Sequence, residues 1–475
     1  MSLSKILAEL AVTIPATSLP SSAMDAAAKM TLDTLATGIA GWNADGVPES
    51  LALLRDWGGN PQCTVLVHGD RLPPPLAAFI NGMMIHALDY DDLYRPAALH
   101  LMSSVLPVCL AAGELKSRTG RDLLAGVVLG VEVAARLGLA LQPCWRRDQG
   151  AGFLPSTIIG GFGATAAAAR MLGLTVEQTT HALGIYYAQN AGNRQALYDK
   201  TLTKRMQPAL AARAALWAAQ LAERGLTGPR GAIEGDAGLI RLYAASDQKI
   251  SPAALREALP EYQIEKLAIK RFPSCGACHP LTQAALDLVR EHSLEPARIE
   301  EIELYLGEGG NRMVGMPFEI GETPQANAQF SVAYGVALAL LRKGADITRY
   351  TSESILADEK VAALARQIRI LHHLPEPPER ERFSDDEPSF VDQPHVLTVR
   401  TRDGRTLSAR SSIRAVLSPE SGDFETAAAK LRECAAFSGI CPPDQAGAVI
   451  EAVRQLKDTT NLDGLLKLCT RPTIH

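Results

Sequence analysis

Residues 75–93, PLAAFINGMMIHALDYDDL, indicate most clearly how this chain folds. Apolar side chains recur there at the spacing of one helix face: Leu76, Phe79, Ile80, Met83, Met84, Ala87 and Leu88. This period predicts a helix with a buried face. The apolar run stops at the acidic residues Asp89, Asp91 and Asp92, and Arg95-Pro96 then favours a loop. We therefore predict a buried helix that ends at an acidic cluster.

Helical patterns continue on both sides of this stretch. Five segments combine apolar periodicity with frequent alanine or glycine: residues 103–117, 122–141, 162–173, 176–192 and 208–225. We expect Ser103 or Ser104 to cap the first of them. Because small residues let helices approach closely, this part of the chain is predicted to form a compact helical bundle.

The character of the sequence changes near residue 270. IEEIELYL (299–306) alternates as a strand does, and residues around 367–371 form a second candidate strand. HVLTVRTRDGRTLSARS (395–411) predicts a hairpin that turns at Asp403-Gly404. Helices are expected over 328–343 and 352–365, with a proline-rich charged loop at 375–390.

The pattern returns to helix after about residue 413, and these last helices are expected to pack on the first domain. The predicted fold is mainly α with an α+β part. A large helical domain is built from residues 1–266 and 413–475, and a smaller α+β lid domain, residues 267–412, is inserted between them. A chain of 475 residues exceeds one typical core, which agrees with two domains.

Composition excludes several classes of protein. The net charge is −5 and no long basic stripe occurs, so nucleic acid is not an expected partner. The eight cysteines are scattered, which fits a reducing cytosol. The start of the chain, MSLSKILAELAV, resembles no signal peptide. Residues 150–169 are uncharged but rich in glycine and alanine, which favours a close-packed buried helix over a membrane span. We therefore expect a soluble, cytoplasmic protein.

Three stretches that could suggest a metal or a cofactor are interpreted as structural features instead. GFGATA lacks the spacing of a dinucleotide-binding loop, and we interpret GGFGA as helix packing. We interpret Asp89, Asp91 and Asp92 as a solvated helix end, because the spacing of a calcium loop is absent. Cys275-Gly276-Ala277-Cys278-His279 matches a haem-attachment motif. Since no export signal accompanies that motif, we favour a local loop before a helix. No metal and no cofactor are expected.

What remains is a set of polar residues in apolar surroundings. Its members are Asp89, His100, Lys204, Lys270, Arg271 and Tyr334. Each of them taken singly has a structural alternative as a helix cap, a surface cation or a buried tyrosine.

These residues lie in segments that resemble the MmgE/PrpD family, whose members include 2-methylcitrate dehydratase, cis-aconitate decarboxylase and iminodisuccinate epimerase. The segments are NGMMIHALDYDD with HLMSSVLPVCLAAGE, LTKRMQPALAARAALWAAQLAERGLTGP, KRFPSCGACHPLTQAALDL and ANAQFSVAYGVALALL. They keep the order of the family and cover nearly the whole chain.

The resemblance implies a helical domain with an inserted α+β lid, a homodimer and no cofactor. It places the family's catalytic groups on Asp89, His100, Lys204, Lys270 and Tyr334. Lys204, Lys270, Arg271 and Cys275 are expected to bind the substrate. This chain departs from the family at Leu93, where threonine or serine is usual, and at Leu154, where many members carry a second histidine. The loop to His100 is also one residue longer than in the decarboxylase.

The implied chemistry is acid–base catalysis on a small di- or tricarboxylate in an interdomain cleft. A proton removed next to a carboxylate leaves charge that cations such as Lys204 and Lys270 can stabilise. Our first expectation is a lyase, with dehydration of a citrate-like acid ahead of decarboxylation. Alternatives are an isomerase or epimerase of a dicarboxylate and a catalytically impaired carboxylate-binding protein. A haem-carrying redox protein is the last alternative.

Overall fold

The structure is a computed structural model that describes residues 2–147, 152–243, 250–257, 259, 261–373 and 392–471. The chain divides into two units. The first unit holds residues 1–194, 205–269 and 422–475, and the second holds residues 195–204 and 270–421. The mainly α fold with a smaller α+β part, expected from the sequence, is confirmed. The sequence predicted domain boundaries after residues 266 and 412. In the structure the chain passes from one unit to the other after Ile269 and after Ser421.

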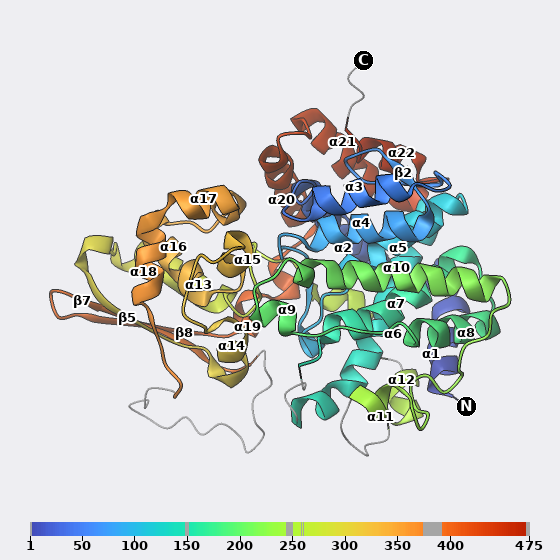
Figure 1. Cartoon of the computed structure of the whole chain (residues 1–475), viewed down its shortest axis with the longest axis horizontal. Helices are drawn as coiled ribbons and strands as arrows, with labels where there is room; N and C mark the ends of the chain where they lie inside the picture. Colours follow the sequence, from blue (N-terminus) through green and yellow to red (C-terminus); the bar gives the residue numbers. More distant parts are fainter. Residues whose placement is uncertain are drawn as a thin grey trace. The chain divides into compact units, whose positions relative to one another are not determined.

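The first unit is built almost entirely of helices (Figure 1). Its helices are α1 (Leu3–Val12), α2 (Ser21–Ala40), α3 (Val47–Trp57), α4 (Pro74–His86), α5 (Met102–Leu115), α6 (Gly120–Arg147), α7 (Pro155–Leu172), α8 (Val176–Tyr187), α10 (Thr203–Glu223), α11 (Leu239–Tyr243), α12 (Pro252–Arg256), α20 (Phe424–Ser438), α21 (Pro443–Arg454) and α22 (Asp463–Leu468). The first two residues of α10 are counted with the second unit. Two short antiparallel pairs join β1 (Cys63–Thr64) to β2 (Arg71–Leu72) and β3 (Leu93–Tyr94) to β4 (Leu267–Ala268).

Helix α4 is the buried helix predicted from residues 75–93. All of its residues except Leu76 are buried, because neighbouring helices surround it. Gly82 makes this close packing possible. A Cβ atom there would stand 2.9 Å from the carbonyl oxygen of Ser103 in α5 and 3.2 Å from the Cα of Ala209 in α10. A larger residue would therefore force α4 away from both neighbours.

Helices α6 and α7 pack even more closely. A Cβ on Gly163 would lie 2.5 Å from the carbonyl oxygen of Gly130, so only glycine fits this crossing. This confirms that GGFGA serves helix packing. Of the helices in the described ranges, α6 alone is long and apolar enough over Gly120–Leu141 to cross a membrane, and 89% of its apolar window is buried in the protein.

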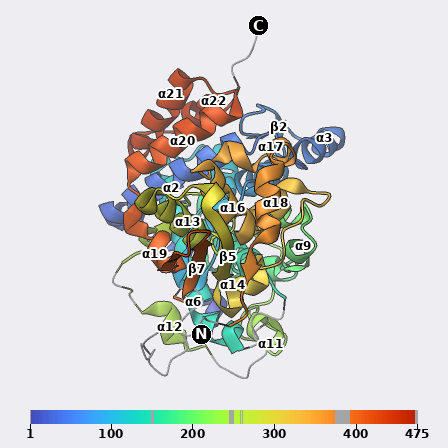
Figure 2. The same cartoon turned by 90° about the vertical axis from the view of Figure 1, so that its left-hand side faces the viewer.

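The C-terminal helices return to the first unit and pack against its N-terminal part. Figures 1 and 2 both show α20 beside α2, and the two helices are in contact. A buried ion pair joins them, with Lys430 Nζ 2.7 Å from Asp33 Oδ1. The same ammonium donates to the carbonyl oxygen of Tyr90 at 2.7 Å. Lys430 therefore ties α20 both to α2 and to the segment that follows α4.

The N-terminus of α5 is capped from a distance. Asp92 accepts hydrogen bonds from the backbone N–H of Leu101 at 3.1 Å and of Met102 at 2.9 Å. A hydrogen-bond acceptor at this end is favoured, because the first N–H groups of a helix have no partner within it. The expectation that Ser103 or Ser104 caps α5 is wrong. The Ser104 hydroxyl donates instead to the carbonyl oxygen of Pro208, and both serines lie inside the first turn.

The second unit contains a four-stranded sheet in the order β6-β5-β7-β8. The strands are β5 (Ile299–Tyr305), β6 (Arg369–Ile370), β7 (His395–Thr401) and β8 (Thr406–Ser411). Its helices are α9 (Gln195–Tyr198), α13 (His279–His292), α14 (Gly307–Val314), α15 (Pro324–Gln329), α16 (Val332–Arg342), α17 (Ser352–Ala357), α18 (Glu359–Gln367) and α19 (Ile413–Val416). Helix α13 packs on β7 and β8, α16 packs on α13, and α18 packs on α16 (Figures 1 and 2).

The hairpin predicted at Asp403-Gly404 is present. β7 and β8 pair antiparallel from His395↔Ser411 to Arg400↔Thr406, and Gly404 takes a positive φ of 81° in the turn. The two predicted helices of this unit are each broken. Residues 330–331 separate α15 from α16, and Asp358 separates α17 from α18, because Ser331 and Asp358 each accept from a backbone N–H and begin a new helix. The proline-rich segment 375–390 lies outside the described residues.

We predict that the pair between Lys430 and Asp33 contributes strongly to stability. Substituting Lys430→Met keeps the length of the side chain but leaves Asp33 without its nearest cation. Breaking a buried ion pair in this way costs about 3 kcal/mol or more. Chemical denaturation followed by circular dichroism measures the loss. The matched control is Lys467→Met, on an exposed lysine of α22, which should change stability by no more than about 0.5 kcal/mol. Equal stability of K430M and the unchanged protein would contradict the prediction.

We also predict a pH dependence that originates at Asp92. Burial, together with the charge of Asp91, raises the pKa of Asp92 to about 8. An unfolded aspartate titrates near about 3.9, so between these values the native state binds this proton more tightly. The contribution of Asp92 to stability therefore falls as the pH rises towards 8. Asp92→Asn removes the titration, although it also weakens the cap.

The measurement is the free energy of unfolding of both proteins at about pH 6 and about pH 8. The unchanged protein should lose up to about 1.4 kcal/mol per pH unit more than D92N. Asp423→Asn is the control, because Asp423 caps α20 at an exposed position and the hydrogen bond from the Thr426 N–H lowers the pKa of its carboxyl. Parallel pH profiles of D92N and the unchanged protein would exclude Asp92 as the source.

Candidate active site

The acidic cluster after α4 is buried. Asp89, Asp91 and Asp92 have exposed fractions of 2%, 0% and 0%. The interpretation of these residues as a solvated helix end is therefore wrong. The physical reason is that partners distant in sequence reach the carboxylates: backbone N–H groups of α5 for Asp92, and histidine side chains for Asp91.

Three side chains form what we call the histidine–aspartate cluster, namely His86, Asp91 and His100. Nδ1 of His86 lies 2.8 Å from Oδ2 of Asp91, within hydrogen-bond distance. Nδ1 of His100 lies 3.6 Å from the same oxygen. The two rings meet edge to face with their centroids 5.2 Å apart. Both imidazole rings thus face the same carboxylate oxygen of Asp91.

Asp91 remains ionised in this cluster. Burial by itself would raise the pKa of its carboxyl, but the charges of His86 and His100 and their hydrogen bonds outweigh burial and hold the pKa well below its ordinary value. An ionised carboxylate beside an imidazole orients the ring and determines which nitrogen carries the proton. The cluster can therefore hold and deliver a proton.

His100 is the most accessible member of the cluster. Its side chain is 16% exposed, whereas those of His86 and Asp91 are 1% and 0% exposed. Its backbone N–H donates to the Ser156 hydroxyl of α7 at 3.1 Å. Asp92 holds the N–H groups of the next two residues. A group that reaches the cluster from outside therefore meets His100 first, in a position that the backbone determines.

Asp89 lies beside the cluster with unusual backbone geometry. Its φ of 50° is positive, and its N–H donates to the carbonyl oxygen of His86 at 3.1 Å. One carboxylate oxygen is 4.0 Å from Nε2 of His86. The buried cation nearby is Arg205, which donates to the carbonyl oxygen of Asp45. Burial lowers the pKa of Arg205 to about 10, and the charges of Asp45 and Asp89 offset part of this effect.

Among the described residues, the same three side chains form a group that could bind a metal ion. Their possible ligand atoms lie within 4.8 Å of one another. However, two ligands of one tetrahedral zinc ion stand about 3.3 Å apart. The 2.8 Å between His86 Nδ1 and Asp91 Oδ2 is instead a typical donor–acceptor distance of a hydrogen bond. The geometry fits a hydrogen-bonded pair better than two ligands of a single ion.

In the second unit, two lysines gather around Phe330, and we call Lys200 and Lys204 the lysine pair. Nζ of Lys204 lies 4.7 Å from the centroid of the Phe330 ring. Nζ of Lys200 lies 5.7 Å from that centroid and donates to the carbonyl oxygen of Phe330 at 3.2 Å. Burial lowers the pKa of Lys200, and the thiols of Cys278 and Cys275 partly offset this effect.

The cysteine motif forms a loop next to Phe330. The N–H of Cys275 donates to the carbonyl oxygen of Gln329 at 2.9 Å, and Cys278 is buried. Helix α13 begins at His279, the last residue of the motif. The interpretation of the motif as a local loop before a helix is confirmed. Lys204 and Cys275, both predicted to bind substrate, thus contact two adjacent residues of one turn.

Lys270 and Arg271 begin the main segment of the second unit. Lys270 is 1% exposed, whereas Arg271 is exposed, with its guanidinium carbon 6.0 Å from the Phe272 ring centroid. The strand β4 precedes them by two residues and pairs with β3 at Leu93↔Ala268 and Tyr94↔Leu267. Leu93, which replaces the usual hydroxyl residue of the family, is buried in this pairing.

Tyr334 stands at the start of α16. Its ring is 1% exposed and packs against Phe318 and Tyr350, with centroids 5.2 Å and 5.5 Å away. Its hydroxyl donates to the carbonyl oxygen of Arg349 at 2.9 Å. Burial raises the pKa of this hydroxyl above its ordinary value.

The predicted site residues thus fall into both units. Asp89 and His100 lie together in the first, and Lys204 and Cys275 lie close to one turn in the second. The cavity that Tyr334 lines in the second unit contains none of the other predicted residues. That all of them act on one substrate stays a prediction. Leu154, at the position of the family's second histidine, precedes α7 and donates its N–H to the carbonyl oxygen of Gly192.

Sequence reasoning missed four groups: His86, Asp91, Arg205 and Lys200. A signal existed for three of them. His86 and Asp91 stand five residues apart across the end of a buried helix, and Lys200 is spaced by four from Lys204. Arg205 carries no such signal, because its burial depends on Asp45, which is distant in sequence.

Comparison with known proteins gives a consistent result. The model of the MmgE/PrpD N-terminal domain matches residues 5–251, and that of the MmgE/PrpD C-terminal domain matches residues 272–457. The cis-aconitate decarboxylase of Homo sapiens is 31% identical over 460 residues, covering 94% of this chain and 90% of that protein. The cis-aconitate decarboxylase of Mus musculus is 28% identical, covering 94% and 89%. That of Aspergillus terreus is 25% identical over 370 residues, covering 74% and 75%.

These matches extend over both units rather than over one of them. They agree with the resemblance carried by the segments around Asp89, Lys204, Lys270 and Tyr334. The relatives are enzymes, and the matches show an enzyme of the lyase type. The chain belongs to the MmgE/PrpD family.

Proposed function

We propose that this enzyme removes carbon dioxide from a small tricarboxylate of the cis-aconitate type by acid–base chemistry. The observation that carries the proposal is the histidine–aspartate cluster, in which an ionised, buried Asp91 orients two imidazoles and His100 is the accessible one. The relatives named as cis-aconitate decarboxylases support this choice of reaction over dehydration, which the same groups could also perform.

The reaction needs a proton at a defined place and time. When the carbon–carbon bond to a carboxylate breaks, carbon dioxide leaves and the bonding electron pair stays on carbon. In cis-aconitate the electron pair left on the saturated carbon forms a new double bond and displaces the original one, so the charge moves to the far alkene carbon, whose carboxylate shares it as an enediolate-like species. A proton delivered by His100 then forms the new carbon–hydrogen bond. His86 and Asp91 position His100 and do not need to touch the substrate.

The substrate carboxylates that do not leave need cations to bind them. Lys204 and Lys270 are the proposed groups. We add Lys200, because its ammonium contacts Phe330, as that of Lys204 does. Buried cations interact more strongly with developing charge than solvated ones do. Arg271 and Cys275 are proposed substrate contacts. Leu154, where many members of the family carry histidine, favours a substrate with a less polar end at that position.

Dehydration and epimerisation remain defined alternatives. Loss of a hydroxyl group from the carbon next to the deprotonated one gives dehydration, and return of the proton to the opposite face gives epimerisation. Following the family resemblance, we propose that the active form is a cytoplasmic homodimer that uses no cofactor.

We predict that His100→Ala and Lys270→Ala each lower kcat about a hundredfold, because they remove a proton donor and a charge-stabilising cation. Steady-state kinetics with cis-aconitate measures the effect. The controls are His292→Ala and Lys360→Ala, which remove exposed side chains of the second unit. Both controls should retain full turnover, and thermal unfolding should show that all four variants are folded. Unchanged kcat in either test variant would remove that residue from the proposed site.

The reaction itself is tested by proton NMR in deuterated water with cis-aconitate, citrate and 2-methylcitrate. For decarboxylation we expect loss of cis-aconitate, with one deuterium on the former alkene carbon that keeps its carboxylate. Dehydration would appear as an unsaturated acid formed from citrate or 2-methylcitrate. Epimerisation would exchange deuterium at a stereocentre with no loss of carbon or water. If none of these acids is converted, while one of them still binds, the chain is the impaired binding protein instead.

A further inference from the structure

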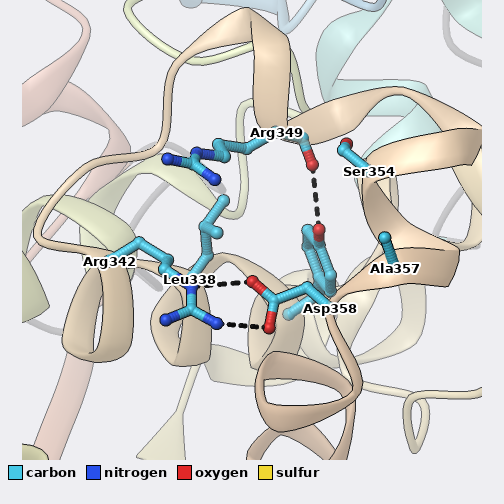
Figure 3. A pocket seen from close by; sticks show the side chains of 7 residues that line it. Leu338, Arg342, Arg349, Ser354, Ala357 and Asp358 are labelled. Carbon is cyan, nitrogen blue, oxygen red and sulfur yellow. Dashed lines mark hydrogen bonds and ion pairs between the residues drawn. The ribbon is translucent and has the colours of Figure 1, made fainter.

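A cavity in the second unit is lined by residues of α16 and α17, of the turn before α17, and by Asp358, which precedes α18 (Figure 3). Its volume is about 330 Å³, at the lower end of the range for small-molecule sites. Tyr334 and Leu338, both 1% exposed, form its apolar floor, and Ala357 adds a small apolar side chain. Arg342, Arg349 and Asp358 supply its charges.

The walls of this cavity are held in place. Arg342 donates to Asp358 through two hydrogen bonds, the one from Nε being 2.7 Å long. Asp358 also accepts from the backbone N–H of Val361 at the start of α18. These bonds, those from Arg342 first, lower the pKa of the Asp358 carboxyl. The Tyr334 hydroxyl holds the backbone carbonyl of Arg349. The Arg342–Asp358 wall and the Arg349 backbone are therefore ordered before a ligand enters.

The charges of the cavity do not cancel. Asp358 neutralises Arg342, and Figure 3 shows its carboxylate turned towards that guanidinium. The Arg349 guanidinium has no hydrogen bond or ion pair with any residue in the described ranges, although its carbonyl oxygen is bonded. Two arginines and one aspartate leave a net charge of +1 on the lining. The cavity is therefore suited to one negative charge.

We infer that this cavity binds a small organic anion with one carboxylate and a short apolar chain. The planar guanidinium of Arg349 matches a carboxylate with two parallel hydrogen bonds. The chain of the ligand would then contact Leu338, Ala357 and the Tyr334 ring. A phosphate fits less well, since it has no apolar part and brings charge that the lining does not balance. Tyr334 is the one predicted site residue among the described residues that line the cavity, and the inference does not depend on the proposed reaction, because that reaction assigns Tyr334 no step.

The test uses the full-length protein and 4,4,4-trifluorobutyrate, whose binding is followed by fluorine NMR. We expect saturable binding, and inorganic phosphate should compete poorly. Arg349→Gln should raise the Kd about tenfold or more, because it removes a charge-assisted pair. Ala357→Leu should also weaken binding, since it fills the cavity and leaves its charge unchanged.

Two controls locate the bound anion. Arg366→Gln removes an exposed arginine of α18 outside the cavity and should leave the Kd unchanged. Lys270→Ala should also leave it unchanged, which separates this cavity from the proposed active site. Binding by R349Q or A357L with the Kd of the unchanged protein would overturn the inference, as would weakened binding in K270A or no saturable binding at all. Circular dichroism and thermal unfolding show whether each variant is folded.

Discussion

Burying carboxylates in a helical core is the constraint on which the first unit depends. Asp33, Asp91 and Asp92 are completely buried, and an ionised carboxylate without partners is very costly there. Lys430 pairs with Asp33, two histidines keep Asp91 ionised, and Asp92 accepts from the first N–H groups of α5 while burial raises its pKa to about 8. These bonds connect α2, α4, α5 and α20. The interactions that stabilise the core are therefore the same ones that hold the proposed catalytic histidine.

The return of the C-terminal helices is explained by this constraint. Lys430 reaches Asp33 and the carbonyl oxygen of Tyr90 from α20, so the last part of the chain supports the segment that carries the acidic cluster. His100 gains its position in the same way, from Asp92 on the following N–H groups and from Ser156 on its own. A proton donor held through the backbone keeps its place while its ring stays accessible, which acid–base catalysis requires.

In the second unit, the side chains of interest are cations rather than buried carboxylates. The lysine pair lies against the Phe330 ring, and Lys200 also donates to the Phe330 carbonyl oxygen, whereas Arg342 is paired with Asp358. An ammonium over an aromatic ring is attracted by the electrons of the ring face. The described residues of this unit place cations both at the Phe330 turn and in the cavity beside Tyr334.

Local patterns in the sequence determined the elements and the family. The helical spacing of residues 75–93, the alternation in 299–306 and Asp403-Gly404 each depend on neighbours within a few residues, and the structure has the helix, strand and turn that they predict. The order of the segments that resemble the family was enough to recognise MmgE/PrpD. Only the tertiary structure decided that the acidic cluster is buried, that Asp92 caps α5, and that His86 and Asp91 complete the cluster of His100. The physical reason is that the solvation of a carboxylate depends on partners brought together by folding, such as Lys430, and no local period encodes where those partners end up.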